Sequence, residues 1–112
     1  MMLIAAVQAR LPGYIALTWS SEGFLDSEPV FAAMAESGVK YVQLVVTQFM
    51  KDLTDTQIVR DADRTPTDES VVFAMNLIRQ YGMEPILKPH VDMYDDSWRG
   101  YIGNYYTEEA EW

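Results

Sequence analysis

The sequence predicts an α/β fold built on a βαβαβ unit, in which parallel strands alternate with helices. Two candidate helices each end at a glycine, Gly38 and Gly82, and after two further residues each glycine is followed by a candidate strand. Strands joined in this way form right-handed crossovers, so we expect three parallel strands in chain order and both helices on one face. The 112 residues, 49% of them apolar, fit one domain with a core of its own.

The first predicted strand covers residues 14–19, a short and mostly apolar run that is typical of a buried strand. The first predicted helix covers residues 28–37, and Asp26 or Ser27 is placed to cap its N-terminus. Pro29 falls in the first turn, where the missing N–H costs nothing. The apolar residues of this helix form one stripe, made of Val30, Phe31, Met34 and Ala35.

The second and third predicted strands cover residues 41–47 and 85–91. Residues 41–47 are rich in β-branched side chains, which favour strands. The polar segment 51–64 shows no regular period, and we predict a long loop there. Long connections after strands are usually functional or disordered, so this loop is a candidate part of a site.

The second predicted helix covers residues 67–81 and ends at Gly82. We expect Thr65 to be its N-cap and Pro66 to be its first residue, because proline is favoured at that position. Asp68 is then placed for a capping-box contact. The helix should bury a stripe of apolar residues, namely Val71, Ala74, Met75 and Ile78.

In sheets with such connections, functional side chains collect where the strands end, in the loops at their carboxyl ends. We call this edge of the sheet the rim. The polar and aromatic residues expected on it are Thr18, Trp19, Glu22, Gln48, His90, Asp92, Trp98 and Arg99. The two Trp rings are either platforms for stacking a sugar ring or parts of the core.

The richest chemistry lies in the third strand, where alternation places Lys88, His90 and Asp92 on one face. A cation, an imidazole and a carboxylate in a row suit hydrogen bonds to sugar hydroxyls, a divalent metal or acid–base catalysis. The alternative is structural, with Lys88 and Asp92 as a buried ion pair and His90 as a core histidine.

Composition excludes several classes of function. With 8 basic and 17 acidic residues the formal charge is −9, and a chain of pI about 4.3 does not suit nucleic acid. There is no cysteine, which excludes disulfides, thiolate nucleophiles and Cys-bound zinc. One histidine makes at most a partial metal site, and the acidic loop lacks EF-hand spacing, so we expect no metal and no cofactor.

Residues 1–12 are predicted to be a lead-in, either an extra strand or residues coded upstream of the domain. Their apolar run, residues 1–7, is far shorter than the roughly 20 residues that span a bilayer. No basic residue precedes this run, as one would in a signal peptide. We therefore expect no membrane partner, and both a cytoplasmic and a secreted location stay open.

Several motifs, taken in order along residues 13–112, resemble glycoside hydrolase family 113, the β-mannanases and related TIM-barrel glycosidases. The most specific are Thr65-Pro-Thr-Asp-Glu69 and Leu87-Lys-Pro-His-Val-Asp92, found together in one chain. The others are Trp19, Tyr41-Val-Gln-Leu-Val-Val-Thr-Gln48, Ile58-Val-Arg-Asp61 and Trp98-Arg-Gly100.

The resemblance implies that residues 1–112 are the N-terminal part of a single TIM-barrel domain, the first three βα units of eight. A complete barrel takes about 250 residues. In the family, retaining hydrolysis depends on glutamates at the ends of the fourth and seventh strands, which nothing in this chain matches. We therefore expect no catalytic residue here, and a chain that is inactive alone.

What the chain is expected to supply is a set of substrate-binding residues for an oligo- or polysaccharide of the β-mannan type. The predicted set is Trp19, Lys88, His90, Asp92, Trp98 and Arg99. A second hypothesis is a standalone small α/β module for ligand binding or interaction, without catalysis. Three parallel strands cut from a barrel leave the edge of the third strand unpaired, which predicts self-association and exposed Trp and Leu side chains.

Overall fold

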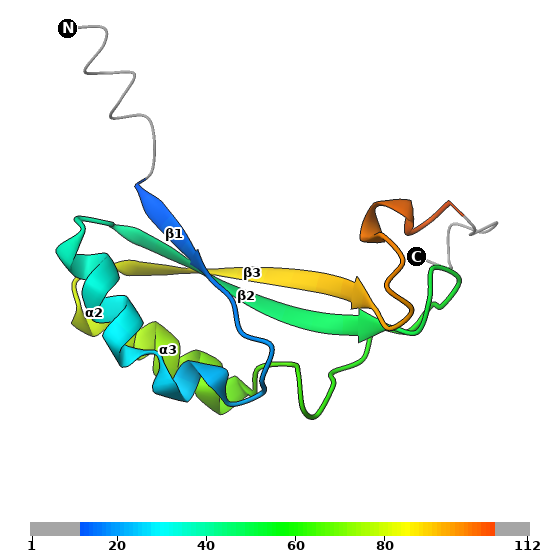
Figure 1. Cartoon of the computed structure of the whole chain (residues 1–112), viewed down its shortest axis with the longest axis horizontal. Helices are drawn as coiled ribbons and strands as arrows, with labels where there is room; N and C mark the ends of the chain where they lie inside the picture. The colour runs from blue at the N-terminus through cyan, green and yellow to red at the C-terminus, as the bar shows by residue number, and fades with distance from the viewer. Residues whose placement is uncertain (1–11, 105–112) are drawn as a thin grey trace, which may run out of the picture.

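A computed structural model describes residues 12–104, which form a three-stranded parallel sheet with two α-helices on one of its faces (Figure 1). The strand order is β1–β2–β3, with both pairs parallel. The elements are β1 (Gly13–Ala16), η1 (Gly23–Asp26), α2 (Glu28–Glu36), β2 (Tyr41–Met50), α3 (Asp68–Gln80), β3 (Glu84–Met93) and η2 (Arg99–Tyr101). The predicted α/β fold of parallel strands in chain order is confirmed. Of the predicted lead-in, all but Pro12 lies outside the described residues.

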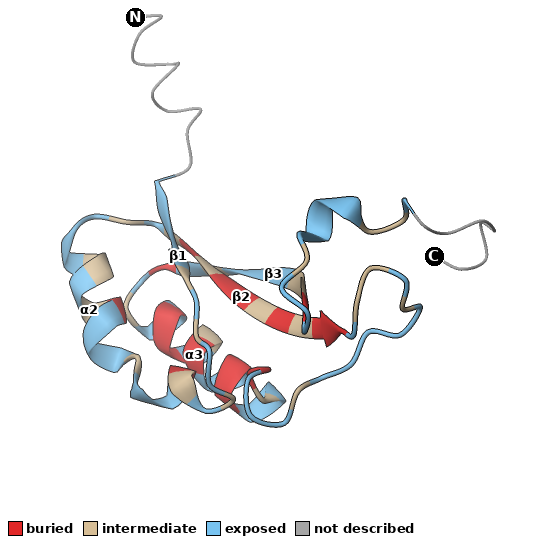
Figure 2. Ribbon diagram, turned by 45° about the vertical axis from the view of Figure 1, so that its right-hand side comes forward, coloured by how far each residue is buried: buried red, intermediate tan, exposed pale blue. Residues whose placement is uncertain are grey.

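The core lies between the sheet and the two helices. Val42 and Leu44 of the central strand belong to this core and are fully buried. The helices contribute three more fully buried residues, Phe31, Ala74 and Ile78. Figure 2 shows the buried side of α3 facing the sheet, whereas β3 is largely exposed. No helix within residues 12–104 has the length and apolar character needed to cross a membrane.

The strand boundaries differ from the prediction, most of all where β1 and β2 end. β1 ends at Ala16, because the Ser20 amide donates to the hydroxyl of Thr18 (3.2 Å) and so begins a turn. β2 continues to Met50, because it pairs with β3 in unbroken register as far as Met50↔Met93. Both changes move the rim: Trp19 lies in the turn after β1, and β2 and β3 extend further than the sequence indicated.

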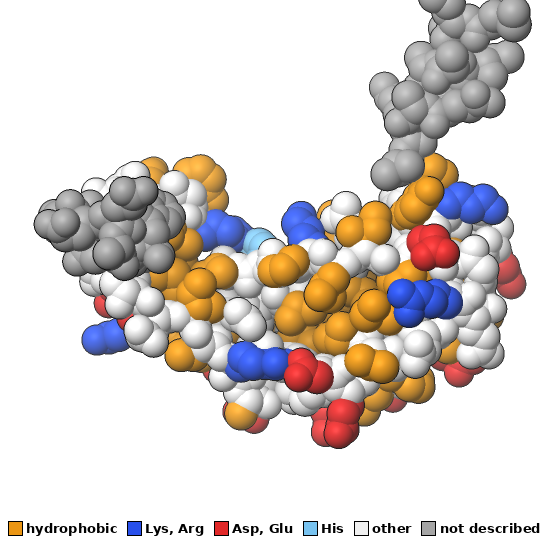
Figure 3. Space-filling view, turned by 180° about the vertical axis from the view of Figure 1, so that it is seen from behind, with side chains coloured by type: hydrophobic (Ala, Val, Ile, Leu, Met, Phe, Trp, Pro, Cys, Tyr) orange, Lys and Arg blue, Asp and Glu red, His pale blue; other side chains and the backbone are white. Residues whose placement is uncertain are grey.

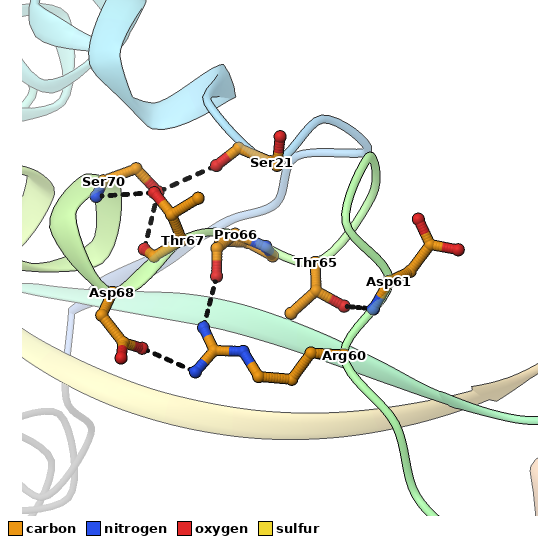
Figure 4. Close-up of polar contacts among 8 residues, drawn as sticks. All are labelled: Ser21, Arg60, Asp61, Thr65, Pro66, Thr67, Asp68 and Ser70. Atoms are coloured by element: carbon orange, nitrogen blue, oxygen red, sulfur yellow. Dashed lines mark hydrogen bonds and ion pairs between the residues drawn. The ribbon is translucent and has the colours of Figure 1, made fainter.

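The start of α3 also corrects the prediction. The N-cap is Thr67, whose hydroxyl accepts a hydrogen bond from the Ser70 amide (3.1 Å) (Figure 4). Thr65 instead accepts from the amide of Asp61 (2.8 Å) and ties the long loop to the helix. Pro66 is buried and its carbonyl accepts from Arg60 (3.0 Å), so the helix begins at Asp68. For α2, Ser27 occupies the predicted N-cap position, although its side chain makes no capping hydrogen bond.

The corrected cap gives a first testable result. Thr67→Ala is expected to lower the free energy of unfolding by about 1 kcal/mol, the usual cost of losing an N-cap side chain. Urea denaturation followed by circular dichroism measures the change. The matched control is Thr56→Ala in the exposed loop, for which we expect almost no effect. An equal loss in both variants would show that the capping bond contributes nothing.

The outer edge of β3 is interrupted by prolines. The amide of Glu84 donates to the carbonyl of Lys40, the residue before β2 (2.8 Å), and the amide of Tyr94 donates to the carbonyl of Met50 in β2 (3.0 Å). Alternate residues of a strand bond the same neighbour, so the odd-numbered amides of β3 point away from β2. Pro85 and Pro89 occupy two of these outward positions and have no N–H to offer. Natural sheets limit edge pairing in this way.

We therefore expect self-association of the chain to be restrained at this edge. Pro89→Val restores an outward amide and should raise the fraction of dimer and larger species at a given concentration. Sedimentation velocity over a concentration series measures this. Pro29→Ala, at the start of α2 and away from the edge, is the control and should leave the sedimentation profile unchanged. If Pro89→Val sediments like the unmodified chain, the β3 edge is not the contact surface.

Candidate functional site

The register of the sheet fixes which side chains of β3 point away from the helices. Val42 and Leu44 of β2 pack into the helix-side core, so Val45, Thr47 and Phe49 lie on the opposite face. These three pair with Lys88, His90 and Asp92, which therefore share that opposite face as predicted: the pairs are Val45↔Lys88, Thr47↔His90 and Phe49↔Asp92. Both of the last two pairs lie in the half of the sheet that ends at the rim.

A pocket of about 280 Å³ opens at the rim, and we call it the rim pocket. Four of the six predicted binding residues line it: Trp19, Asp92, Trp98 and Arg99. They come from the turn after β1, from the end of β3 and from the segment entering η2. His90 does not line the pocket itself but contacts Arg99, whereas Lys88 lies further back on the strand, exposed and outside the pocket.

Three polar residues join the pocket wall to the strand. The guanidinium of Arg99 donates to Nε2 of His90 from Nε (2.9 Å), and its Nη2 lies 2.6 Å from the same atom. Nη2 of Arg99 also lies 3.3 Å from a carboxylate oxygen of Asp92. In Figure 3, the imidazole lies beside cationic side chains on the surface. Asp92 is thus paired with Arg99, and an ion pair of Asp92 with Lys88, the structural alternative, is not among the ion pairs of the described residues.

Burial of the ring and these contacts together shift the pKa of His90. Burial is the largest influence and lowers the pKa of His90 below its usual value, because a partly enclosed imidazolium loses hydration. The neighbouring charges of Arg99 and Lys88 lower the pKa of His90 further, and Asp92 opposes them. The pKa of His90 therefore lies below its usual value, which favours the neutral imidazole near pH 7.

A further cation completes the pocket, and sequence reasoning missed it. The guanidinium of Arg64 lies 5.3 Å from the ring centroid of Phe49 and 5.4 Å from that of Tyr94. The two rings are stacked with centroids 5.0 Å apart. Arg64 and Phe49 both line the rim pocket, which therefore contains two arginines, Arg64 and Arg99. Cation–π contacts of this kind hold a guanidinium in place without neutralising it.

The loop that carries Arg64 is fixed at several points. The phenol of Tyr94 donates to Asp61 (2.6 Å), which lowers the pKa of Asp61 and raises that of Tyr94. Phe49 and Val59 form an antiparallel bridge with two backbone hydrogen bonds of 2.8 Å. These contacts therefore hold the predicted long loop 51–64 against the rim.

Contacts at the start of α3 also fix the turn after β1 (Figure 4). The Ser70 hydroxyl donates to the carbonyl of Ser21 (3.1 Å), and Thr67 donates its amide to the same carbonyl (2.9 Å). Arg60 forms an ion pair with Asp68 (2.8 Å). The turn after β1 and the long loop are thus both held to the N-terminus of α3.

Thr47 is the one buried side chain within residues 12–104 whose polar atom has no hydrogen-bond partner. It is 1% exposed and pairs with His90 across the sheet. No group of three or more His, Asp or Glu residues that could hold a metal occurs among the described residues.

Parallel βα units with a polar and aromatic pocket at the carboxyl ends of the strands are typical of (β/α)-barrel folds. The family model for Glycoside Hydrolase Family 113 matches residues 18–112. The chain belongs to glycoside hydrolase family 113, as its motifs indicated. A search of curated proteins found no match.

Solved structures agree with this assignment. A GH113 β-1,4-mannanase in a complex superposes with a TM-score of 0.75 at 16% identity, over 88% of this chain and 33% of that one. The GH113 β-mannanase AaManA from Alicyclobacillus acidocaldarius in complex with ManMIm is 25% identical, with a TM-score of 0.72, over 82% of this chain and 30% of that one. The chain spans about a third of the length of these enzymes.

Proposed function

We propose that the rim pocket binds a β-linked mannose oligosaccharide and that the chain supplies substrate-binding residues of a β-mannanase-like enzyme. One observation carries the proposal: in a family 113 chain, two Trp rings, a carboxylate and a guanidinium from separate segments line one pocket. These are Trp19, Trp98, Asp92 and Arg99. The mannanase names of the solved neighbours support the choice of sugar.

The pocket lining can contact both the apolar face and the hydroxyl groups of a sugar. Trp19 and Trp98 are 61% and 62% exposed, so their faces are accessible to the C–H face of a pyranose. Asp92 accepts and Arg99 donates hydrogen bonds, which matches the mixed character of sugar hydroxyls. Arg64 adds a second set of donors to the pocket lining, and His90 accepts a hydrogen bond from Arg99.

We propose further that the chain alone does not hydrolyse glycosides. Retaining hydrolysis needs two carboxyl groups about 5 Å apart across the scissile bond, one of which acts as nucleophile. The family resemblance assigns these groups to the fourth and seventh strands, and residues 12–104 form three strands. Asp92, at the rim, is paired with Arg99.

The test is calorimetric titration of the chain with β-1,4-mannopentaose, together with an assay for new reducing ends. We expect saturable binding that Trp98→Ala weakens several-fold, and no release of reducing ends. Phe73→Ala, an exposed aromatic on α3, is the control and should bind like the unmodified chain. Absence of binding, or equal binding by the Trp98→Ala variant, would contradict the proposed site. Hydrolysis would contradict the proposed lack of catalysis.

A further inference from the structure

Two N–H groups of Arg99 point at one nitrogen of His90. Nε and Nη2 of the guanidinium lie 2.9 and 2.6 Å from Nε2 of the imidazole. A guanidinium in a protein stays protonated and has only donors, so the atom it approaches must be an acceptor. In a neutral imidazole only one nitrogen is an acceptor, and the other carries the proton.

Arg99 is itself held in this orientation. Its Nη2 lies 3.3 Å from Oδ1 of Asp92, which follows His90 by two residues on the same face of β3. The charged groups around the imidazole are Lys88 and Asp92 from β3 and Arg99, the first residue of η2, and β2 contributes the uncharged Thr47. The carboxylate thus fixes the guanidinium, and the guanidinium fixes the ring.

We propose that Arg99 is a positioning residue that holds His90 in the neutral tautomer protonated at Nδ1. The imidazole then has one polar atom left, Nδ1–H, which is a donor and has no partner among the described residues. This deepens the function proposed above and rests on it for its consequence: His90 presents a donor, so it can bond an acceptor oxygen of the sugar and cannot bond a group that only donates. With the opposite tautomer the same position would select for the opposite kind of group.

The sequence makes the proposal directly measurable, because the chain contains one histidine. Two-bond ¹H–¹⁵N correlation spectra of the chain labelled at its imidazole nitrogens report which nitrogen carries the proton. Above the titration of His90, we expect a protonated Nδ1 and an unprotonated Nε2 in the unmodified chain. An Nε2–H ring, or an equal mixture of tautomers, would overturn the proposal without any variant.

Three substitutions then separate the role of Arg99 from general effects on folding. Arg99→Met removes the donors and the charge, so the fixed tautomer should be lost and the pKa of His90 should rise towards its usual value. Arg99→Lys keeps a charge and a donor, and should retain part of the tautomer preference. Arg79→Met, at the far end of α3, is the control and should change neither quantity.

If Arg99→Met keeps the Nδ1–H form, with the sheet intact by circular dichroism, Arg99 does not select the tautomer and the proposal fails. The measurement needs no ligand. A failure here therefore leaves sugar binding in the rim pocket untouched, and a failure of mannopentaose to bind leaves the tautomer assignment untouched.

Discussion

Leu44→Ala is expected to destabilise the chain by about 2–5 kcal/mol, because it removes a large side chain from a core that cannot collapse around the cavity. Leu44 is 0% exposed on the central strand and packs against both helices. Small domains have roughly 5–15 kcal/mol of stability in total, and this core lies on only one side of a three-stranded sheet. We therefore expect the variant to unfold at a much lower urea concentration than the unmodified chain.

The chain offers a matched control for this substitution. Leu87 is the direct partner of Leu44 in the register of β2 and β3, but it is 51% exposed. Leu87→Ala should cost less than about 1 kcal/mol, since little apolar area is lost from the folded state. Urea denaturation at low concentration measures both variants. If Leu87→Ala costs as much as Leu44→Ala, then Leu87 is covered in solution, which would indicate a contact between copies of the chain.

The second large effect is expected in catalysis by a full-length family 113 enzyme that carries the Lys-Pro-His-Val-Asp motif. Replacing the histidine at the position of His90 by Ala should lower kcat/KM by roughly 1–3 kcal/mol, which is about 5- to 150-fold. The loss has two sources: the ring holds Arg99, which lines the rim pocket, and its own Nδ1–H can bond a part of the sugar that lies beyond the pocket lining.

Replacement by Ala at the position of Lys51 serves as the control. Lys51 is exposed in the acidic loop and does not line the rim pocket, so kcat/KM should change little. Initial rates on mannan or mannopentaose give both values. Unchanged mannan hydrolysis by the His90→Ala variant would remove His90 from the sugar site and leave it a structural histidine.

The order and direction of the strands could be predicted because local signals agree with the fold. Gly38 and Gly82 have φ values of 84° and 78°, a backbone conformation that glycine adopts without strain and that ends a helix. The placement of His90 and Asp92 on one face followed from the two-residue period of a strand. These features depend on residues close together in sequence, so the sequence was sufficient.

Features that depend on distant contacts could not be predicted. Thr65 and Thr67 both flank Pro66, and either could cap a helix. The choice depends on Ser70, which donates to Ser21 at a position 49 residues earlier. Arg64 gave no signal at all, because its place in the pocket depends on how the loop folds over the stacked rings of Phe49 and Tyr94.

Lys88 shows the limit of a pattern that was otherwise informative. It shares a face with His90 and Asp92, but a strand advances about 3.3 Å per residue, so it lies about 13 Å further from the rim than Asp92. Alternation determines the face and not the depth along the strand. From that position the lysine side chain does not reach the rim pocket, and Lys88 stays a predicted binding residue without a contact in the pocket.

The most direct measurement of sugar recognition at the rim is chemical-shift mapping of the ¹⁵N-labelled chain during titration with mannopentaose, with cellopentaose as the gluco-configured control. We predict that mannopentaose shifts a contiguous set of signals from Trp19, Arg64 and residues 90–99, and that cellopentaose shifts them less at equal concentration. Shifts confined to the apolar groove between β1 and α2, around Val30 and Met34, would contradict a sugar site at the rim, and so would no shifts at all.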